Sequence, residues 1–101
     1  MTDEAFYRFL GLCMRAGKLV SGEDTVLRLV RDRKVDLVLI SNDASNNTEK
    51  LFHAKCQSYN TPIKTAGTRE HLGRAIGKQE RVVLGITDKG FAKKLTSMID
   101  D

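Results

Sequence analysis

The side chains that most often carry catalysis or bind metal are few in this chain, and their spacing suits neither role. Cys13 and Cys56 lie far apart, and neither belongs to a Cys-x-x-Cys pair. Each falls among apolar neighbours, where a thiol acts as a small buried hydrophobe. His53 and His71 have no partner at metal-ligand spacing, so we expect both to be exposed helical residues. The segment 85–90 (GITDKG) lacks the spacing of a phosphate-binding P-loop. We therefore expect no metal, no cofactor and no enzymatic activity.

Two short turns that contain glycine carry more information, Ser21–Glu23 (SGE) and Ala66–Thr68 (AGT). A turn that opens a helix presents free backbone N–H groups and a positive dipole end, and glycine lets a phosphate approach the backbone closely. Basic residues flank both turns: Arg15, Lys18, Arg28, Arg69 and Arg74. If both turns lie on one rim, these cations form a surface for an anionic ligand. The alternative is that two structural turns are surrounded by solvated charges.

The elements that must position these turns alternate regularly along the chain. Amphipathic spacing predicts helices over 3–14 and about 23–33, and then through Phe52–Tyr59, Leu72–Ile76 and Phe91–Met98. Nearly unbroken apolar runs predict buried strands at Val35–Ile40 and Arg81–Ile86, and shorter extended stretches occur at Lys18–Val20 and from Ile63. The order α-β-α-β-α-β-α-β-α predicts an α/β fold with a central sheet between helices.

Polar residues mark the starts of several of these helices. Ser21 with Asp24 three residues later resembles a capping arrangement for the helix at 23–33. Thr68 and Asp88 stand in the N-cap positions of the two helices that follow them, and Gly77 stands where the first of those two must end.

Length and composition place the chain among ordinary globular proteins. Its 101 residues, 41% hydrophobic and 30% charged, suit a single domain over 1–101 with a core of its own. The 17 Lys and Arg exceed the 13 Asp and Glu, a net charge of +4 that favours an anionic partner. No apolar run is long enough to span a membrane, and the start MTDE lacks the basic region of a signal peptide. We expect a cytoplasmic protein without membrane contact, monomeric when free.

Several segments together resemble a known family. In order and spacing they are Ala16–Glu23 (AGKLVSGE), Lys34–Ala44 (KVDLVLISNDA), Asn60–Ile63 (NTPI) and Leu72–Gly77 (LGRAIG). They look like the kink-turn RNA-binding ribosomal protein family of the L7Ae and L30e type. The closing Ile86–Leu95 (ITDKGFAKKL) looks like its small bacterial YlxQ branch. The resemblance runs from about residue 5 to residue 96.

The resemblance implies a three-layer α-β-α sandwich with a central mixed four-stranded sheet. It also implies that structured RNA meets two segments of the chain. Carried over by position, the first contact group is Gly22, Glu23, Asp24, Thr25 and Arg28, and the second is Ala66, Gly67, Thr68 and Arg69. Lys18 and Arg74 would be supporting cations. Cations and helix N-termini suit crowded phosphates, and short polar side chains suit exposed base edges.

The chain departs from the family pattern at one point. Members that bind kinks tightly usually carry an Asn-Glu pair and a Lys, where this chain has Glu23-Asp24 and Arg28. Two adjacent carboxylates repel phosphates, and Asp lacks the amide donors of Asn. The departure predicts weaker binding to an ordinary kink-turn.

Three functions are compatible with these residues. The first is non-catalytic binding of structured RNA, including ribosomal RNA, in ribosome structure, assembly or RNA regulation, alongside ribosomal or RNA-processing proteins. The second is a protein-interaction adaptor with a degenerate RNA face, which the Glu23-Asp24 pair would favour. The third is a nucleotide-binding enzyme domain, which the lack of any general base, nucleophile or metal cluster disfavours.

Overall fold

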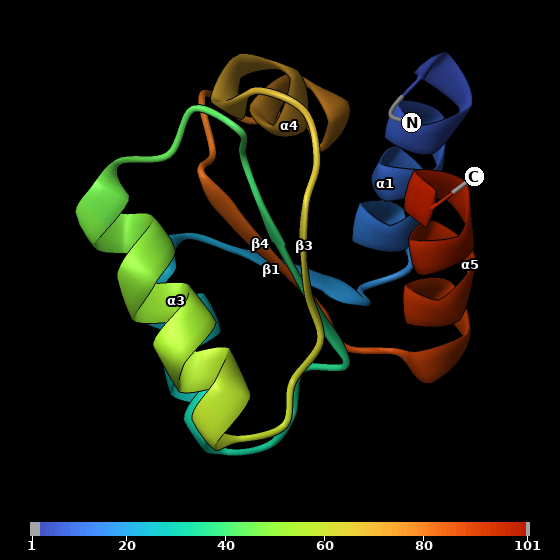
Figure 1. Ribbon diagram of the computed structural model, residues 1–101. Helices are drawn as coiled ribbons and strands as arrows, with labels where there is room; N and C mark the ends of the chain where they lie inside the picture. The colour runs from blue at the N-terminus through green and yellow to red at the C-terminus, as the bar shows by residue number, and fades with distance from the viewer. Residues whose placement is uncertain (1–2, 101) are drawn as a thin grey trace.

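The computed structural model describes residues 3–100, which form five helices and four strands in strict alternation (Figure 1). The elements are α1 (Glu4–Arg15), β1 (Leu19–Ser21), α2 (Glu23–Arg31), β2 (Leu37–Ile40), α3 (Asn46–Ser58), β3 (Ile63–Thr65), α4 (Arg69–Ala75), β4 (Val83–Ile86) and α5 (Lys89–Asp100). The predicted element order is therefore confirmed.

The four strands form one mixed sheet in the order β1-β4-β2-β3. Strand β4 is antiparallel to both of its neighbours, with Leu19 opposite Ile86 on one side and Leu37 opposite Ile86 on the other. Strands β2 and β3 are parallel. It follows that β1, β2 and β3 all run in one direction and that β4 alone runs against them.

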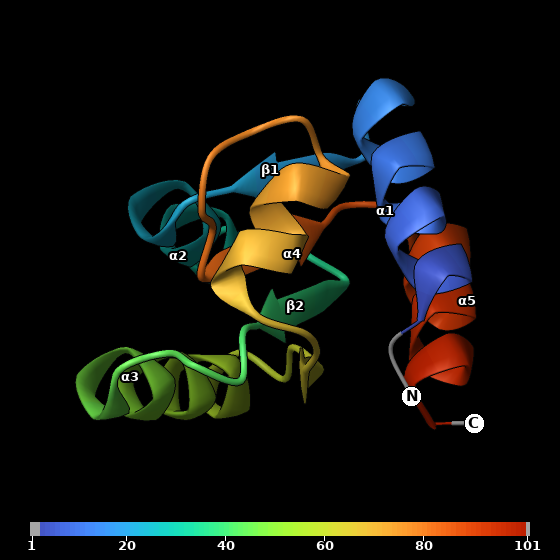
Figure 2. The ribbon, with the colours of Figure 1, turned by 90° about the horizontal axis from the view of Figure 1, so that it is seen from above.

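Each face of the sheet is covered by helices, which is why the two central strands, β2 and β4, are apolar without interruption and fully buried. Leu37 and Leu39 point into a core shared with α1, α4 and α5, whereas Val38 and Ile40 point into a core shared with α2 and α3. Figure 1 shows α3 on one side of the sheet and α1 with α5 on the other, and Figure 2 shows α2 beside α3. The predicted three-layer α-β-α sandwich is confirmed.

Several local predictions are also confirmed. Cys13 and Cys56 are fully buried, one in each core, and burial raises the pKa of each thiol to about 11. Thr68 caps α4, and the Asp88 carboxylate accepts a hydrogen bond from the Phe91 N–H at 2.9 Å.

The predicted capping role of Ser21 and Asp24 is wrong. The N-cap of α2 is Gly22, and no side chain caps this helix. The Ser21 hydroxyl instead accepts a hydrogen bond from Arg81, which lies 60 residues further along the chain. A residue at the end of a strand takes its side-chain partner from the neighbouring strand, which local spacing does not reveal.

No helix within residues 3–100 is long and apolar enough to cross a membrane. In the same range, no group of three or more His, Cys, Asp or Glu side chains could hold a metal ion.

Candidate functional site

Three helices begin at the same edge of the sheet. Because β1, β2 and β3 run in one direction, the helices that follow them, α2, α3 and α4, all start where those strands end. We call this edge the rim and define it by residues 21–28, 41–48, 66–74 and 78–83. Each helix N-terminus carries a partial positive charge and N–H groups that have no acceptor within the helix. Their convergence makes the rim suited to anionic ligands.

The start of α2 is open. Gly22 adopts φ 98° and ψ 145°, a conformation that side chains rarely permit, and its N–H donates to the Val83 carbonyl at 3.1 Å. Within the described part of the chain, no side chain forms a capping hydrogen bond with the first turn of this helix. Glu23 and Asp24 are exposed there, and Arg28 is exposed one turn further along. Backbone donors, two carboxylates and a guanidinium therefore share one surface.

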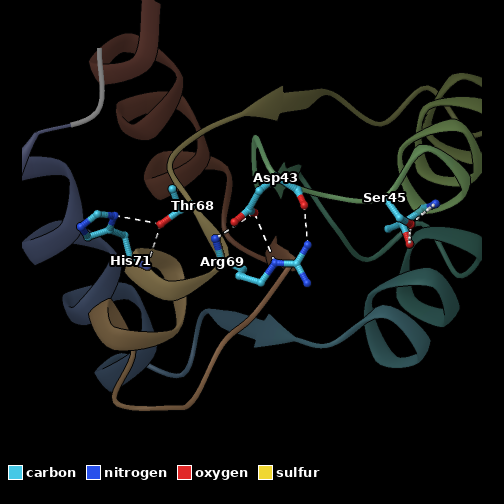
Figure 3. Close-up of polar contacts among 6 residues, drawn as sticks. Asp43, Ser45, Thr68, Arg69 and His71 are labelled. Atoms are coloured by element: carbon cyan, nitrogen blue, oxygen red, sulfur yellow. Dashed lines mark hydrogen bonds and ion pairs between the residues drawn. The ribbon is translucent and has the colours of Figure 1, made fainter.

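Glu23 is held in place by the neighbouring helix. The Thr48 hydroxyl donates to Glu23 Oε1 at 3.3 Å, and Ser45 Oγ donates to Thr48 Oγ1 at 3.1 Å. Ser45 Oγ also accepts from the Thr48 N–H at 3.2 Å and so caps α3 (Figure 3). The first turn of α3 thus orients a carboxylate that belongs to α2.

The second glycine turn rests on the first helix. Gly67 has φ 67° and is buried, and its carbonyl accepts from the Asn42 N–H at 2.7 Å. A Cβ at this position would overlap the Tyr7 hydroxyl. The Tyr7 ring stacks on His71, with ring centroids 5.4 Å apart. Two features therefore favour glycine at this turn, its backbone conformation and the tyrosine side chain beneath it.

Arg69 ties the start of α4 to the loop after β2. Its backbone N–H donates to Asp43 Oδ1 at 3.1 Å, its Nε lies 3.5 Å from the same oxygen, and its guanidinium also donates to the Asp43 carbonyl (Figure 3). The nearby Ser41 hydroxyl and then Arg69 hold the pKa of the Asp43 carboxyl below its usual value. Ser41 Oγ is buried and has no hydrogen-bond partner among residues 3–100. Asp43 was not among the residues singled out from the sequence.

Arg81 joins the two predicted contact groups, and its role could not be predicted from the sequence. Its Nε donates to Ser21 Oγ at 3.3 Å, and its backbone N–H donates to the Arg69 carbonyl at 3.0 Å. Arg81 also lines two adjoining hollows of about 370 and 520 Å³, one reaching Gly22 and Glu23 and the other reaching Glu70. In the sequence, Arg81 is only the first residue of the strand predicted at Arg81–Ile86. The observed strand begins at Val83, and its antiparallel pairing with β1 brings Arg81 next to Ser21.

Comparison with known proteins assigns this arrangement to a family. The family model for "Ribosomal protein L7Ae/L30e/S12e/Gadd45" matches residues 4–96. The chain belongs to this family. It is 47% identical to the RNA-binding protein YlxQ of Bacillus subtilis over 99% of this chain and 100% of that protein. It is 35% identical to the large ribosomal subunit protein eL30 of Branchiostoma belcheri, over 96% of this chain and 87% of that one.

Solved structures agree with this assignment. A protein of unknown function from Bacillus halodurans has a TM-score of 0.94 at 45% identity and covers 98% of this chain and 100% of its own. The 15.5kD RNA binding protein of Giardia lamblia has a TM-score of 0.78 at 20% identity. The match covers 99% of this chain and 92% of that one. At that identity the second likeness shows the L7Ae-type fold alone.

Most of the residues predicted to contact RNA lie together on the rim of this L7Ae-family chain. The group from Gly22 to Arg28 lies at the start of α2, and the group from Ala66 to Arg69 lies at the start of α4. Between the ends of β1 and β3 are three strand spacings, a separation of roughly 14 Å. Arg74 lies further along α4, where it pairs with Glu70 at 2.9 Å.

Lys18 does not join this surface. Its carbonyl accepts from the Thr87 N–H at 2.9 Å, whereas the Gly22 N–H pairs with Val83. Thr87 and Val83 flank opposite ends of β4, so Lys18 lies at the end of the sheet away from the rim. Lys18 and Gly22 are close in sequence, but a strand separates them.

Basic and acidic side chains balance on the rim. The basic ones are Arg28, Arg69, Arg74, Lys78 and Arg81. The acidic ones are Glu23, Asp24, Asp43, Glu70 and Glu80. Two of the five cations are already held by rim carboxylates, Arg69 by Asp43 and Arg74 by Glu70. The electrostatic attraction of the rim for an anion therefore rests on the other three cations, Arg28, Lys78 and Arg81, and on the helix N-termini.

Proposed function

We propose that this chain is a non-catalytic protein that binds structured, kink-turn-like RNA through the rim. The observation that carries the proposal is the convergence of three helix N-termini at one edge, with α2 capped by glycine alone. Membership of the L7Ae/L30e/S12e/Gadd45 family and the RNA-binding name of the Bacillus subtilis relative support it. The ribosomal relatives favour a role in ribosome structure, assembly or RNA regulation in the cytoplasm.

The physics of a kinked RNA suits this surface. A sharp bend crowds phosphates and exposes base edges that a regular A-form helix keeps out of reach. The N–H groups at the start of α2 and the guanidinium of Arg28 suit the phosphates. The turn at Gly67 lies on the far side of the rim and would meet the other strand of the bend. In this proposal, the rim recognises the shape of the RNA and not a linear sequence.

The two carboxylates of α2 suit base edges and not phosphates. A carboxylate accepts hydrogen bonds and cannot donate them, so it pairs with amino or imino groups of the bases. Glu23 is already oriented by Thr48, which lowers the entropy cost of such a contact. We therefore assign Glu23 and Asp24 to base choice and Arg28 to phosphate binding.

A gel-shift titration tests this proposal. The protein is mixed with a short kink-turn RNA and with the same RNA in which the kink is destroyed by base substitution. The proposal requires tighter binding to the intact kink. Equal affinity for the two RNAs would reject kink recognition. No binding to either RNA would favour a protein-interaction adaptor, for which the balanced charge of the rim is the supporting observation.

A further inference from the structure

The rim does not account for the basic character of the chain. Its five basic and five acidic side chains cancel, whereas the whole chain has a net charge of +4. All of the excess positive charge therefore lies on other surfaces. Because phosphate binding depends on clustered cations, a further anion contact requires a place outside the rim where unpaired cations gather.

Four lysines gather at the end of the sheet opposite the rim, and we call this surface the basic pole. They are Lys18, Lys34, Lys89 and Lys93, all exposed. The Thr87 N–H bonds to the Lys18 carbonyl, and the N–H of Asp36 donates to the Ile86 carbonyl at 2.7 Å. These two bonds bring the segments before β1 and β2 to the start of α5. In Figure 1 the start of α5 lies at the bottom, away from α4 at the top.

The four lysines of the basic pole outnumber the three carboxylates of the same segments, and they are not held by them. None of the four forms an ion pair with a residue in the range 3–100. Asp88 at the start of α5 is engaged in capping that helix. Asp32 and Asp36 are the other carboxylates in the segments that form the pole, and Asp36 is half-buried. The four ammonium groups are thus available to an external anion.

A groove of about 390 Å³ runs between two of these lysines and the segments before β2 and β3. Lys89 and Lys93 are four residues apart on α5, so they share one face of the helix with a rise of roughly 6 Å between them. The rest of the lining includes one carboxylate, Asp36, together with Asn60 and Thr96, and no aromatic ring on which a base could stack. Its chemistry suits a charged backbone and not base recognition.

We propose that the basic pole is a second RNA contact, which binds the phosphate backbone of a regular duplex without reading its sequence. The proposal rests on RNA binding at the rim and extends it. The molecule measures 31 × 27 × 25 Å, and its two contact surfaces lie at opposite ends of the sheet. One straight duplex cannot touch both ends, so the protein would hold two RNA segments together.

The test uses a fluorescently labelled RNA duplex of about 20 base pairs without a kink, longer than the roughly 16 base pairs that a duplex-binding domain spans. Its affinity is measured by anisotropy at several salt concentrations between about 50 and 200 mM for the full chain and for Lys89→Gln/Lys93→Gln. Each bound phosphate adds roughly 0.9 to the salt slope, so removing both ammonium groups lowers the slope by about 2. The affinity of the unaltered chain should fall roughly 10-fold more than that of the variant over this range.

A matched control distinguishes the loss of two charges at the basic pole from the loss of two charges elsewhere on the surface. Lys50→Gln/Lys55→Gln removes the same two charges from α3 and should leave duplex binding within about 2-fold. Equal weakening by the two double variants would overturn the proposal, because the effect would then come from net charge. Displacement of the duplex by polyglutamate at equal charge would also overturn it, in favour of an acidic protein partner.

The same variants keep this inference distinguishable from the proposed function. Lys89→Gln/Lys93→Gln should bind the short kink-turn RNA as the unaltered chain does, because that RNA contacts the rim. If the kink-turn RNA fails to bind while duplex binding still depends on Lys89 and Lys93, kink recognition is rejected and the basic pole stands. If the kink-turn RNA binds and the duplex does not, duplex binding at the basic pole is rejected, and kink-turn binding at the rim is retained.

Discussion

Arg69 donates to Asp43 from its backbone N–H at 3.1 Å and reaches the same residue again with its guanidinium. One acidic residue in the loop after β2 thereby fixes both the first backbone donor and the side chain of the first residue of α4. Arg69 is one of the residues predicted to bind RNA, and the structure places its guanidinium in this internal clamp with the side chain 37% exposed. The clamp sets the distance between two of the three helix starts on the rim.

Asp43→Asn should loosen this clamp and lower the melting temperature by a few degrees at neutral pH. The pKa of Asp43 is lowered in the folded chain, so its carboxylate stabilises the fold above the ordinary Asp pKa of about 3.9. That stabilisation is lost as the pH falls through the folded-state pKa. Melting curves of both proteins between about pH 7 and pH 2.5 should therefore converge at the acid end. A constant gap across this range would show that the carboxylate charge has no part in the clamp.

Gly67→Ala should destabilise the chain more than an alanine at another glycine with positive φ. Gly17 has φ 72° and open space around it, so Gly17→Ala carries only the backbone cost, roughly 1 kcal/mol. Gly67→Ala adds the overlap with Tyr7, which should cost roughly 1–3 kcal/mol more. Unfolding in denaturant measures the free energy of unfolding of both variants.

The Tyr7 hydroxyl can be tested directly in the same assay. Tyr7→Phe removes the atom that a Cβ at Gly67 would meet first, so the double variant should recover part of the cost of Gly67→Ala. Simple additivity of the two changes would mean that the overlap is relieved by movement of the turn.

Asp24→Asn should change RNA preference and leave stability nearly unchanged. Asp24 forms no cap of α2, so its replacement removes a charge that repels phosphates and adds two donors at almost the same shape. Discrimination between the kink-turn and its mutated control should increase by roughly 1 kcal/mol if the new amide makes one hydrogen bond to a base. Gel shifts and a melting curve are needed together. A shifted melting temperature with unchanged discrimination would give Asp24 a purely structural role.

Arg28→Ala and Arg81→Ala should each weaken kink-turn binding and flatten its salt dependence. Removing a cation that binds one phosphate lowers the salt slope by roughly 0.7 to 0.9. Lys55→Ala removes the same charge from the last turn of α3 and should leave the slope unchanged. An unchanged slope for both arginine variants at several salt concentrations would place the RNA elsewhere.

Neither thiol should react with a disulfide reagent while the chain is folded. Burial raises the pKa of Cys13 and Cys56 to about 11, so only about one thiol in a thousand is ionised at pH 8. Because the folded-state pKa is raised, stability should fall as the pH rises from about 9 towards 11, where only the unfolded chain loses these protons. Reaction should follow global unfolding in urea. Fast reaction of the native protein with one equivalent of the disulfide reagent would contradict the burial of both thiols.

The order and type of the secondary-structure elements follow from the sequence alone. Val38 and Ile40 belong to a short apolar run in which β-branched residues alternate with leucine, and such a run suits a strand that helices cover on both faces. Thr68 and Asp88 cap their helices through bonds that span three residues. These interactions join residues that are close in sequence, so the spacing of residue types along the chain is enough to predict them.

The tertiary structure alone decided which of the charged residues share a surface. Arg81 meets Ser21 because β4 runs antiparallel to β1, and Asp43 meets Arg69 because β2 and β3 are parallel neighbours. Lys18 is close to Gly22 in sequence, yet the length of β1 places it at the opposite end of the sheet. Strand order and direction are set by the packing of the whole core. No local spacing records them, so a site built across several strands becomes visible only in the folded chain.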